Sequence, residues 1–356
     1  MRLPTLTLAL AALLACASGD ETGASSSAVV GGYFDQSAGP TVAVFRCDGA
    51  CAFSPFLNAL EICSGTLIAP NLVLTARHCV AQEVGSDQGV LCSSSTFGDV
   101  QPADNYIITP SDSAFAGGPW IIANEVDVAG SPGDLECGND VAVLHLRQSY
   151  VGAQPASVRI ASPPVKGETY SAVGYGDDED GGLGYRHRRD GLKVQCVGTQ
   201  CKFVGTDGAP VVAPSELLGQ TGLCGGDSGG PALDTNGIVI GVTSRAAGGC
   251  TTPVYSRVDA HAAWLQAQAV AAASAGNYPL PAWAYATLPS DAGTDAAAID
   301  ASAPIDASPP AEDAATTAAG QAVGGCGVAE GEGNALVAFL LLGLLRFSRR
   351  SSKSKS

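Results

Sequence analysis

The stretch GDSGGP at residues 226–231, preceded by Cys224, indicates how this 356-residue chain folds and what chemistry it carries. Glycines on both sides of Ser228 permit backbone conformations that other residues resist. Such a turn can direct the N–H groups of Gly226 and Ser228 at one oxygen, which suits acyl transfer. The alternative is an ordinary surface turn, since Gly, Asp, Ser and Pro are common in turns. The first interpretation predicts that Ser228 is a nucleophile.

A nucleophilic serine needs a histidine as base and a carboxylate that orients the histidine. His78 lies in LTARHC at residues 74–79, directly after the apolar stretch 66–74. Asp140 lies in NDVAVL at residues 139–144, at the head of a run typical of a buried strand. The chain therefore supplies the three parts in the order histidine, aspartate, serine. The other histidines are interpreted as surface or core residues: His145, His187 and His261.

The order and surroundings of these residues resemble the chymotrypsin and trypsin family of serine peptidases. The resemblance covers roughly residues 29–273: VVGG at 29–32 is similar to the family's mature N-terminus, and VYSRV at 254–258 leads into its C-terminal helix. It implies two antiparallel β-barrels with the active site between them. His78 and Asp140 would come from the first barrel and Ser228 from the second.

Short apolar runs rich in Val, Ile and Thr recur between turn signals and favour an all-β core. Examples are residues 40–45, 169–174 and 237–244. Residues 259–268 are predicted to form a helix capped by Asp259, with Trp264 and Leu265 packed on the second barrel. The expected fold class is all-β, with one C-terminal helix after the two barrels.

The resemblance also implies how the residues act. In the catalytic triad the histidine takes the serine proton and the aspartate holds the imidazole, while two backbone N–H groups bind the developing oxyanion. The implied residues are His78, Asp140 and Ser228 for the triad, and Gly226 and Ser228 for the oxyanion hole.

Activation is expected to depend on a buried ion pair. By the resemblance, Asp227 pairs with the α-amino group of Val29 once the chain is cut before that residue. Losing one partner of such a pair costs about 3–5 kcal/mol, enough to keep a precursor inactive. The prediction is a zymogen, and the propeptide ending in Ala28 makes self-activation by an enzyme that prefers small residues a further hypothesis.

The expected substrate pocket differs from that of trypsin-like enzymes. Gly222 stands at the base of the pocket, where those enzymes have an aspartate, and Ala246 stands where relatives with deep pockets have glycine. Ser244 is expected beside Asp140. These residues predict a preference for small or apolar side chains before the scissile bond rather than Arg or Lys. Arg77 and Arg245 differ from the residues that the family commonly has at these two positions. Each either determines specificity or is a solvated side chain.

The 12 cysteines indicate an exported protein, since disulfides persist in oxidising compartments. The resemblance supports the disulfides Cys63–Cys79 and Cys224–Cys250. Proximity and elimination suggest Cys92–Cys137, Cys47–Cys51 and Cys196–Cys201. The chain has no paired CxxC motifs, so we expect neither a metal site nor a cofactor.

Both ends of the chain are interpreted as targeting and processing segments rather than as parts of the folded domain. Residues 1–17 resemble a signal peptide, in which Cys16 is either a lipidation site or part of an ordinary cleavage site, and residues 18–28 form the propeptide. After the peptidase domain (29–273), residues 274–325 are predicted to be a disordered Ala/Pro/Asp-rich stalk.

The tail, residues 326–356, resembles a myxobacterial-type C-terminal sorting signal. That resemblance implies attachment to the bacterial cell surface through Cys326. The alternative is a marginal membrane anchor, because the apolar run 335–345 is short for a bilayer.

A formal net charge of −16 makes nucleic acid an unexpected partner. The expected partners are protein or peptide substrates and the cell envelope, for a monomer. The acidic run 177–180 is either a calcium loop or a solvated turn. Two other function classes stay open: a catalytically idle binding module on the same fold, and an esterase, whose Gly-x-Ser-x-Gly elbow this sequence matches less well.

Overall fold

The computed structural model describes residues 29, 31–51, 59–86, 89–116, 118–177, 183–206, 208–220, 222–247 and 252–287. The predicted signal peptide, propeptide and C-terminal tail lie outside these residues, as do residues 288–325 of the predicted stalk. Cys250 and the acidic residues 178–180 also lie outside them. In the part described, no helix is long and apolar enough to cross a membrane.

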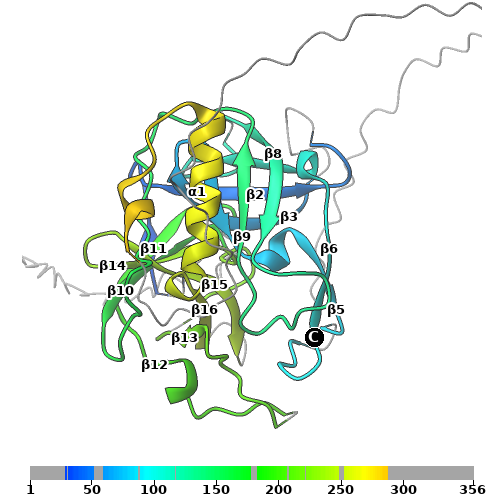
Figure 1. The fold of residues 1–356 in the computed structure, drawn as a ribbon, viewed down its shortest axis with the longest axis vertical. Coiled ribbons are helices and arrows are strands. Elements are labelled where there is room, and N and C mark those ends of the chain that lie inside the picture. Colours follow the sequence, from blue (N-terminus) through cyan, green and yellow to red (C-terminus); the bar gives the residue numbers. More distant parts are fainter. Residues whose placement is uncertain are drawn as a thin grey trace, which may run out of the picture. The chain divides into compact units, whose positions relative to one another are not determined.

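Six strands close into an antiparallel barrel in the order β2-β3-β4-β9-β8-β7 (Figure 1). Their bounds are β2 Thr41–Cys47, β3 Ala59–Ala69, β4 Leu72–Thr75, β7 Tyr106–Thr109, β8 Ile121–Val128 and β9 Ala142–Leu146. The apolar stretch 66–74 forms a hairpin, because Pro70 and Asn71 reverse the chain between β3 and β4. The end of β4 leads directly into the turn that carries His78.

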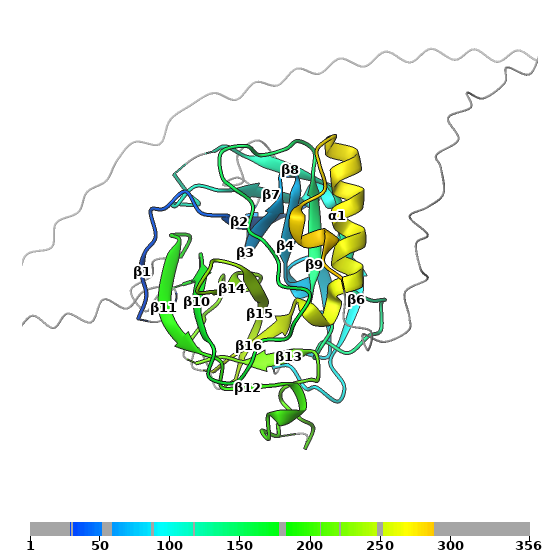
Figure 2. The ribbon, with the colours of Figure 1, turned by 60° about the vertical axis from the view of Figure 1, so that its left-hand side comes forward.

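Eight strands form the second antiparallel sheet, in the order β1-β11-β10-β14-β15-β16-β13-β12. Their bounds are β1 Tyr33–Phe34, β10 Thr169–Gly174, β11 His187–Lys193, β12 Cys196–Val197, β13 Glu216–Leu218, β14 Pro231–Asp234, β15 Val239–Ala247 and β16 Thr252–Arg257. The sheet is a half-barrel beside the closed barrel (Figure 2). The all-β prediction is confirmed.

Shorter elements complete the described fold. Strands β5 Ala81–Val84 and β6 Thr96–Val100 pair with each other. Short 3-10 helices are η2 Arg77–Cys79, η3 Ala103–Asn105, η4 Gly198–Gln200, η5 Asp259–His261 and η6 Ala282–Tyr285.

The two largest hydrophobic cores divide between the sheets. The first fills the closed barrel and continues into Val173, Leu233 and Val242 of the second sheet. The second core lies within the second sheet and includes Val29, whose side chain is fully buried. The segment that begins at the predicted activation point is thus anchored in the sheet that also carries Ser228.

Among the described residues one α-helix, α1 (Ala262–Gly276), lies beside β4, β8 and β9 of the closed barrel (Figure 2). The side-chain amide of Asn71 donates to the carbonyl of Ala272, and His145 Nε2 lies 2.9 Å from the amide of Gln268. The helix therefore contacts the closed barrel, whereas the prediction placed it on the second barrel, and Leu265 belongs to a core to which both sheets contribute.

The start and the end of the C-terminal helix also differ from expectation. Asp259 does not cap α1: it opens η5, and its carboxylate accepts a hydrogen bond from Arg257 instead. Beyond α1 the described chain continues to residue 287, into the predicted stalk. Trp283 is buried and its indole N–H donates to the carbonyl of Ile68, 3.1 Å away. The aromatic side chain anchors a segment whose composition alone suggested disorder.

Four disulfides join predicted partners: Cys47–Cys51, Cys63–Cys79, Cys92–Cys137 and Cys196–Cys201. The fifth predicted pair includes Cys250, which lies outside the described residues. The Cys63–Cys79 bond ties β3 to the turn that carries His78.

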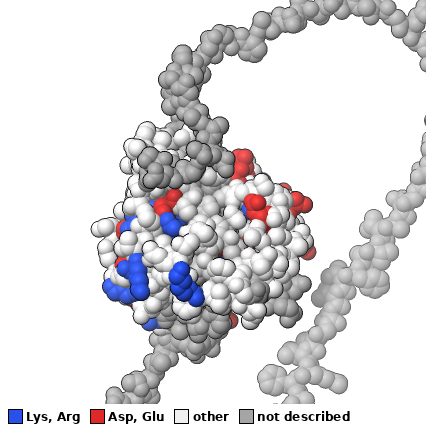
Figure 3. Space-filling model, turned by 60° about the horizontal axis from the view of Figure 1, so that its bottom comes forward, with Lys and Arg blue, Asp and Glu red and all other residues white. Residues whose placement is uncertain are grey.

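Charged side chains are sparse on the face shown in Figure 3. On this face small groups of Lys and Arg side chains lie toward the left, and acidic and basic side chains adjoin each other in places. A nucleic-acid-binding surface would present a continuous basic stripe instead. The expectation that the partner is not a nucleic acid stays a prediction.

Candidate active site

His78 sits on η2, in the short turn between β4 and β5. The preceding Arg77 is fully buried, with its guanidinium 4.4 Å from the centre of the Phe97 ring. Arg77 Nη2 donates to the carbonyl of Ser131, 2.7 Å away, and Nη1 lies 3.6 Å from the Asp134 carboxylate. Arg77 is therefore a structural anchor of the histidine turn and not a solvated side chain.

Asp140 lies just before β9 and meets His78 twice. Its Oδ1 accepts the backbone N–H of His78 at 2.9 Å, and its Oδ2 lies 2.8 Å from His78 Nδ1. The hydroxyl of Ser244, on β15, donates to the same Oδ2 at 2.6 Å. Asp140 is only 3% exposed, so these contacts replace its hydration.

In the pair of Asp140 and His78, the charge interactions shift each pKa in the direction opposite to the shift caused by burial. Burial alone would raise the pKa of Asp140. The nearby imidazole and the hydrogen bonds from His78 and Ser244 lower this pKa by more than burial raises it, so the net shift is downward. Burial likewise lowers the pKa of His78, and the Asp140 carboxylate raises it to a net value above the ordinary 6.5. The pair therefore favours a charged aspartate that stabilises a protonated imidazole.

Ser228 stands in a turn held from two sides. The N–H of Ser64 donates to the carbonyl of Ser228 at 2.7 Å, and the Ser64 hydroxyl donates to the carbonyl of Gly226 at 2.8 Å. Gly229 has φ +82°, and a Cβ there would lie 2.2 Å from the carbonyl oxygen of Ser64, so only glycine fits. Ser64 was not among the predicted site residues, and its one signal in the sequence is its position next to Cys63.

Asp227 points away from the surface into a fully buried site. Its Oδ1 accepts the N–H of Gly176 at 2.9 Å, and its Oδ2 accepts the N–H of Cys224 at 3.0 Å. Burial raises the pKa of Asp227 to about 7, against these two hydrogen bonds, which lower it. In the uncut chain the nitrogen of Val29 belongs to a peptide bond and carries no positive charge.

Two cavities meet at Ser228. The first, of 250 Å³, is lined by Leu223, Cys224, Gly225, Ser228, Thr243, Ser244, Arg245 and Ala246. It includes three of the four predicted pocket residues. Gly222 is buried and lies outside the set of described residues that line this cavity. The second cavity, of 220 Å³, is lined by both His78 and Ser228.

Arg245 is neither solvated nor free to enter the pocket. Its Nη1 and Nη2 donate to the two carboxylate oxygens of Glu216, at 2.7 and 2.8 Å, and Glu216 is fully buried. Nη1 also donates to the hydroxyl of Ser244 at 3.1 Å. A chain of contacts therefore runs from Glu216 through Arg245 and Ser244 to Asp140. Nothing in the sequence signalled Glu216 as a partner.

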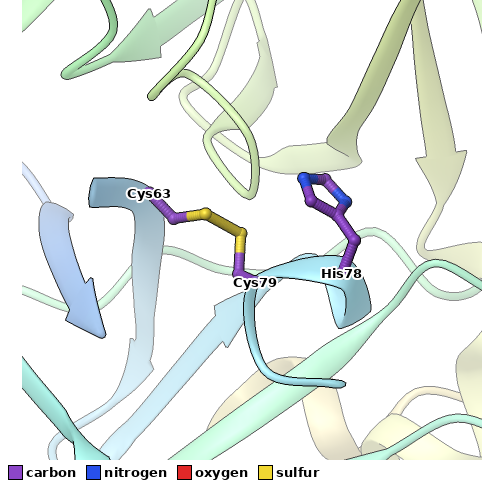
Figure 4. Close-up of side chains that lie close together, drawn as sticks. All are labelled: Cys63, His78 and Cys79. Carbon is purple, nitrogen blue, oxygen red and sulfur yellow. A yellow bond between two sulfur atoms is a disulfide. The ribbon is translucent and has the colours of Figure 1, made fainter. Parts of the chain in front are cut away.

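Figure 4 shows that His78 lies next to Cys63 and Cys79. Together the three resemble a metal-ligand set, but the sulfurs of the two cysteines are joined to each other in a disulfide. A zinc ligand would need the free thiolate. These residues therefore do not fit a metal ion.

The Trypsin family model matches residues 45–265, and the chain belongs to that family. The protein is therefore a hydrolase, a serine endopeptidase. It is 29% identical to trypsin of Saccharopolyspora erythraea, over 58% of this chain and 89% of that protein. It is 26% identical to brachyurin of Leptuca pugilator, over 60% of this chain and 90% of that protein. A solved structure of the scabies mite inactivated protease paralogue S-I1 covers 66% of this chain and 97% of its own at 19% identity, with a TM-score of 0.49.

Proposed function

We propose that this protein cleaves peptide bonds with the triad His78, Asp140 and Ser228. The observation that carries the proposal is the double contact of Asp140 with His78, next to a cavity lined by both His78 and Ser228. Family membership supports protein substrates. The physiological substrate would reach the site as an extended chain along β15, by strand addition.

The proposed reaction proceeds by acylation and then deacylation of Ser228. Ser228 Oγ attacks the substrate carbonyl while His78 Nε2 takes its proton, and Asp140 stabilises the imidazolium that forms. The N–H groups of Gly226 and Ser228 bind the oxyanion of the tetrahedral intermediate. His78 then protonates the leaving amine as the C–N bond breaks, which leaves an ester on Ser228. Water, deprotonated by His78, hydrolyses that ester and regenerates the serine.

Activation would follow from the burial of Asp227. Cutting the bond between Ala28 and Val29 creates an ammonium group, and Val29 already lies in the core of the sheet that carries Ser228. Ion pairing with Asp227 would offset the desolvation that now raises the pKa of that carboxyl. The Asp227 turn adjoins Gly226 and Ser228, so the pair would organise the oxyanion hole. The precursor is thus proposed to be a zymogen.

Substrate preference would come from the 250 Å³ cavity. No acidic side chain is among its described lining residues, which include Leu223, Thr243 and Ala246. Arg245 also lines the cavity, but its guanidinium is paired with Glu216. A Lys or Arg side chain would find no carboxylate there. We therefore propose small or apolar residues directly before the scissile bond.

The proposed location of the enzyme is inferred from the predicted segments at the two ends of the chain. The signal peptide, propeptide, stalk and tail remain predictions for an exported, monomeric enzyme at the cell envelope, attached through a lipid at Cys16 or through the C-terminal tail. Intact mass of the exported protein would show which segments are removed. Retention of all 356 residues would contradict the processing scheme.

A fluorophosphonate probe tests the catalytic proposal, because it esterifies only an activated serine. The chain cut before Val29 should be labelled, Ser228→Ala should not, and Ser162→Ala, a change at an exposed serine, should be labelled like the wild type. Labelling of the uncut chain at the same rate would refute the zymogen. Absence of labelling in the cut chain would favour the catalytically idle binding module.

A further inference from the structure

The 220 Å³ cavity beside His78 is acidic in a way that catalysis does not require. Besides His78, Asp140 and Ser228, it is lined by Glu83 from β5 and by Glu136 from the loop before β9. The proposed mechanism uses Asp140 but neither glutamate. Glu83 is exposed, whereas Glu136 is only 3% exposed.

The other charged groups that line this cavity already have partners. Asp140 is balanced by His78 and by the hydroxyl of Ser244. Arg245, which also lines the cavity, is held by both oxygens of Glu216. The two glutamates are therefore in excess over the positive charge around them.

Glu136 is the more informative of the two. Its Oε1 is buried and has no hydrogen-bond partner among the described residues. Leaving a buried carboxylate oxygen without a partner is costly. Burial, with the charges of Glu83 and Asp140, raises the pKa of Glu136 to about 7. A cation that enters the cavity lined by Glu83 and Glu136 would relieve this repulsion.

We infer that this cavity binds the cationic side chain of a lysine or arginine in the substrate, two residues before the scissile bond. The inference rests on the proposed peptidase function. Both cavities border β15 and share Ser228, Ser244 and Arg245, so a peptide running along β15 enters both on the same side of that bond. Successive side chains of an extended peptide point in opposite directions, so neighbouring residues fill the two cavities.

The shape of the cavity favours a side chain over a metal ion. The apolar side chain of Val90 forms part of the wall, which suits the methylene stem of lysine or arginine. A divalent ion would instead require several convergent oxygen ligands, and one of the nearby carboxylates, Asp140, is occupied by His78. The preferred sequence is therefore a basic residue followed by a small or apolar one.

This specificity bears on activation. The propeptide ends Ser27-Ala28, so Ser27 would occupy the acidic cavity during self-cleavage. Serine has no positive charge to pair with Glu136. The enzyme would therefore cut its own activation site slowly.

Matched fluorogenic peptides test the inference on the cut protein. Two peptides differ only in Lys or Gln two residues before the cut, which is followed by the same Ala. We expect kcat/KM to be about tenfold higher with Lys, the size of one hydrogen-bonded charge pair. The preference should fall below about twofold in Glu136→Gln. It should survive in Glu125→Gln, which removes the same charge from an exposed position on β8.

Three outcomes would overturn the inference: equal rates on both peptides in the wild type, a lysine preference that survives in Glu136→Gln, or acceleration of both peptides alike by Ca²⁺. Binding of the same peptides to Ser228→Ala separates the inference from the catalytic proposal. Tighter binding of the Lys peptide without turnover in the wild type would support the cavity and refute the enzyme. Turnover without any lysine preference would support the enzyme and refute the cavity.

Discussion

Replacing Asp227 by asparagine should change stability in opposite directions before and after activation. In the uncut chain, burial raises the pKa of Asp227 from 3.8 to about 7. One pKa unit is about 1.4 kcal/mol, so ionising this group costs the folded precursor roughly 4 kcal/mol. In the cut chain, the ammonium group of Val29 would pair with the carboxylate. Asparagine would then leave that ammonium unpaired, at a cost of about 3–5 kcal/mol.

The stability of the uncut protein should depend on pH through Asp227. Because the folded-state pKa of Asp227 lies above its unfolded value, the uncut protein loses stability as the pH rises from about 4 to about 7. Asparagine does not titrate, so the Asp227→Asn precursor escapes this loss. The difference in unfolding free energy between the variant and the parent should shift in the variant's favour by roughly 4 kcal/mol between pH 4 and pH 8. Loss of one of the two backbone hydrogen bonds affects both pH values and cancels.

Urea unfolding at both pH values measures this shift. All proteins carry Ser228→Ala to prevent self-cleavage, one set with the bond between Ala28 and Val29 intact and one set beginning at Val29. Asp99→Asn, at an exposed carboxylate, is the control and should show no such shift. The reasoning is refuted if the uncut pair shows a pH-dependent difference below about 1 kcal/mol, or if asparagine stabilises the cut protein as well.

Three further predictions concern other parts of the molecule. Since His78 must be neutral to accept the serine proton and Asp140 raises its pKa, kcat/KM should fall on the acid side with a midpoint above 6.5; a midpoint below that value contradicts the pairing. Glu216→Gln should lower the free energy of unfolding by about 3–5 kcal/mol in urea, because Arg245 loses its buried partner; a loss below about 1 kcal/mol contradicts this. Trp283→Ala should cost about 3–5 kcal/mol in the same assay, whereas an unchanged midpoint would mean that residues 277–287 are not docked.

Local chemistry explains which features were predictable from the sequence. The turn around Ser228 needs glycines at particular positions, because a side chain at Gly229 would collide with the backbone of Ser64. The strands β10 and β15 were predictable from their Val- and Ile-rich runs between turn residues. The closely spaced disulfides, such as Cys47–Cys51, follow from short separations along the chain.

Contacts between distant segments were not predictable in this way. The helix α1 follows the second sheet in the chain but packs on the first barrel, since the partner of a helix depends on where the chain crosses. Residues 277–287 were predicted as part of the stalk, yet Trp283 reaches a buried site, and hydrogen bonds from Tyr278 and Gln266 also hold this segment. Arg245 was left open between two roles, because Glu216 lies 29 residues away in the chain and meets it only in the fold.

The sequence by itself determined the family and predicted the residues for acyl transfer, because a serine turn, a histidine and an aspartate each carry a recognisable local context. It also placed Asp227 and Val29 in one expected pair. Only the tertiary structure decided that Glu83, from β5, and Glu136, from the loop before β9, face the same cavity beside His78. Burial and like charge act through space, so the excess negative charge that we expect to select a basic residue arises only once these segments fold together.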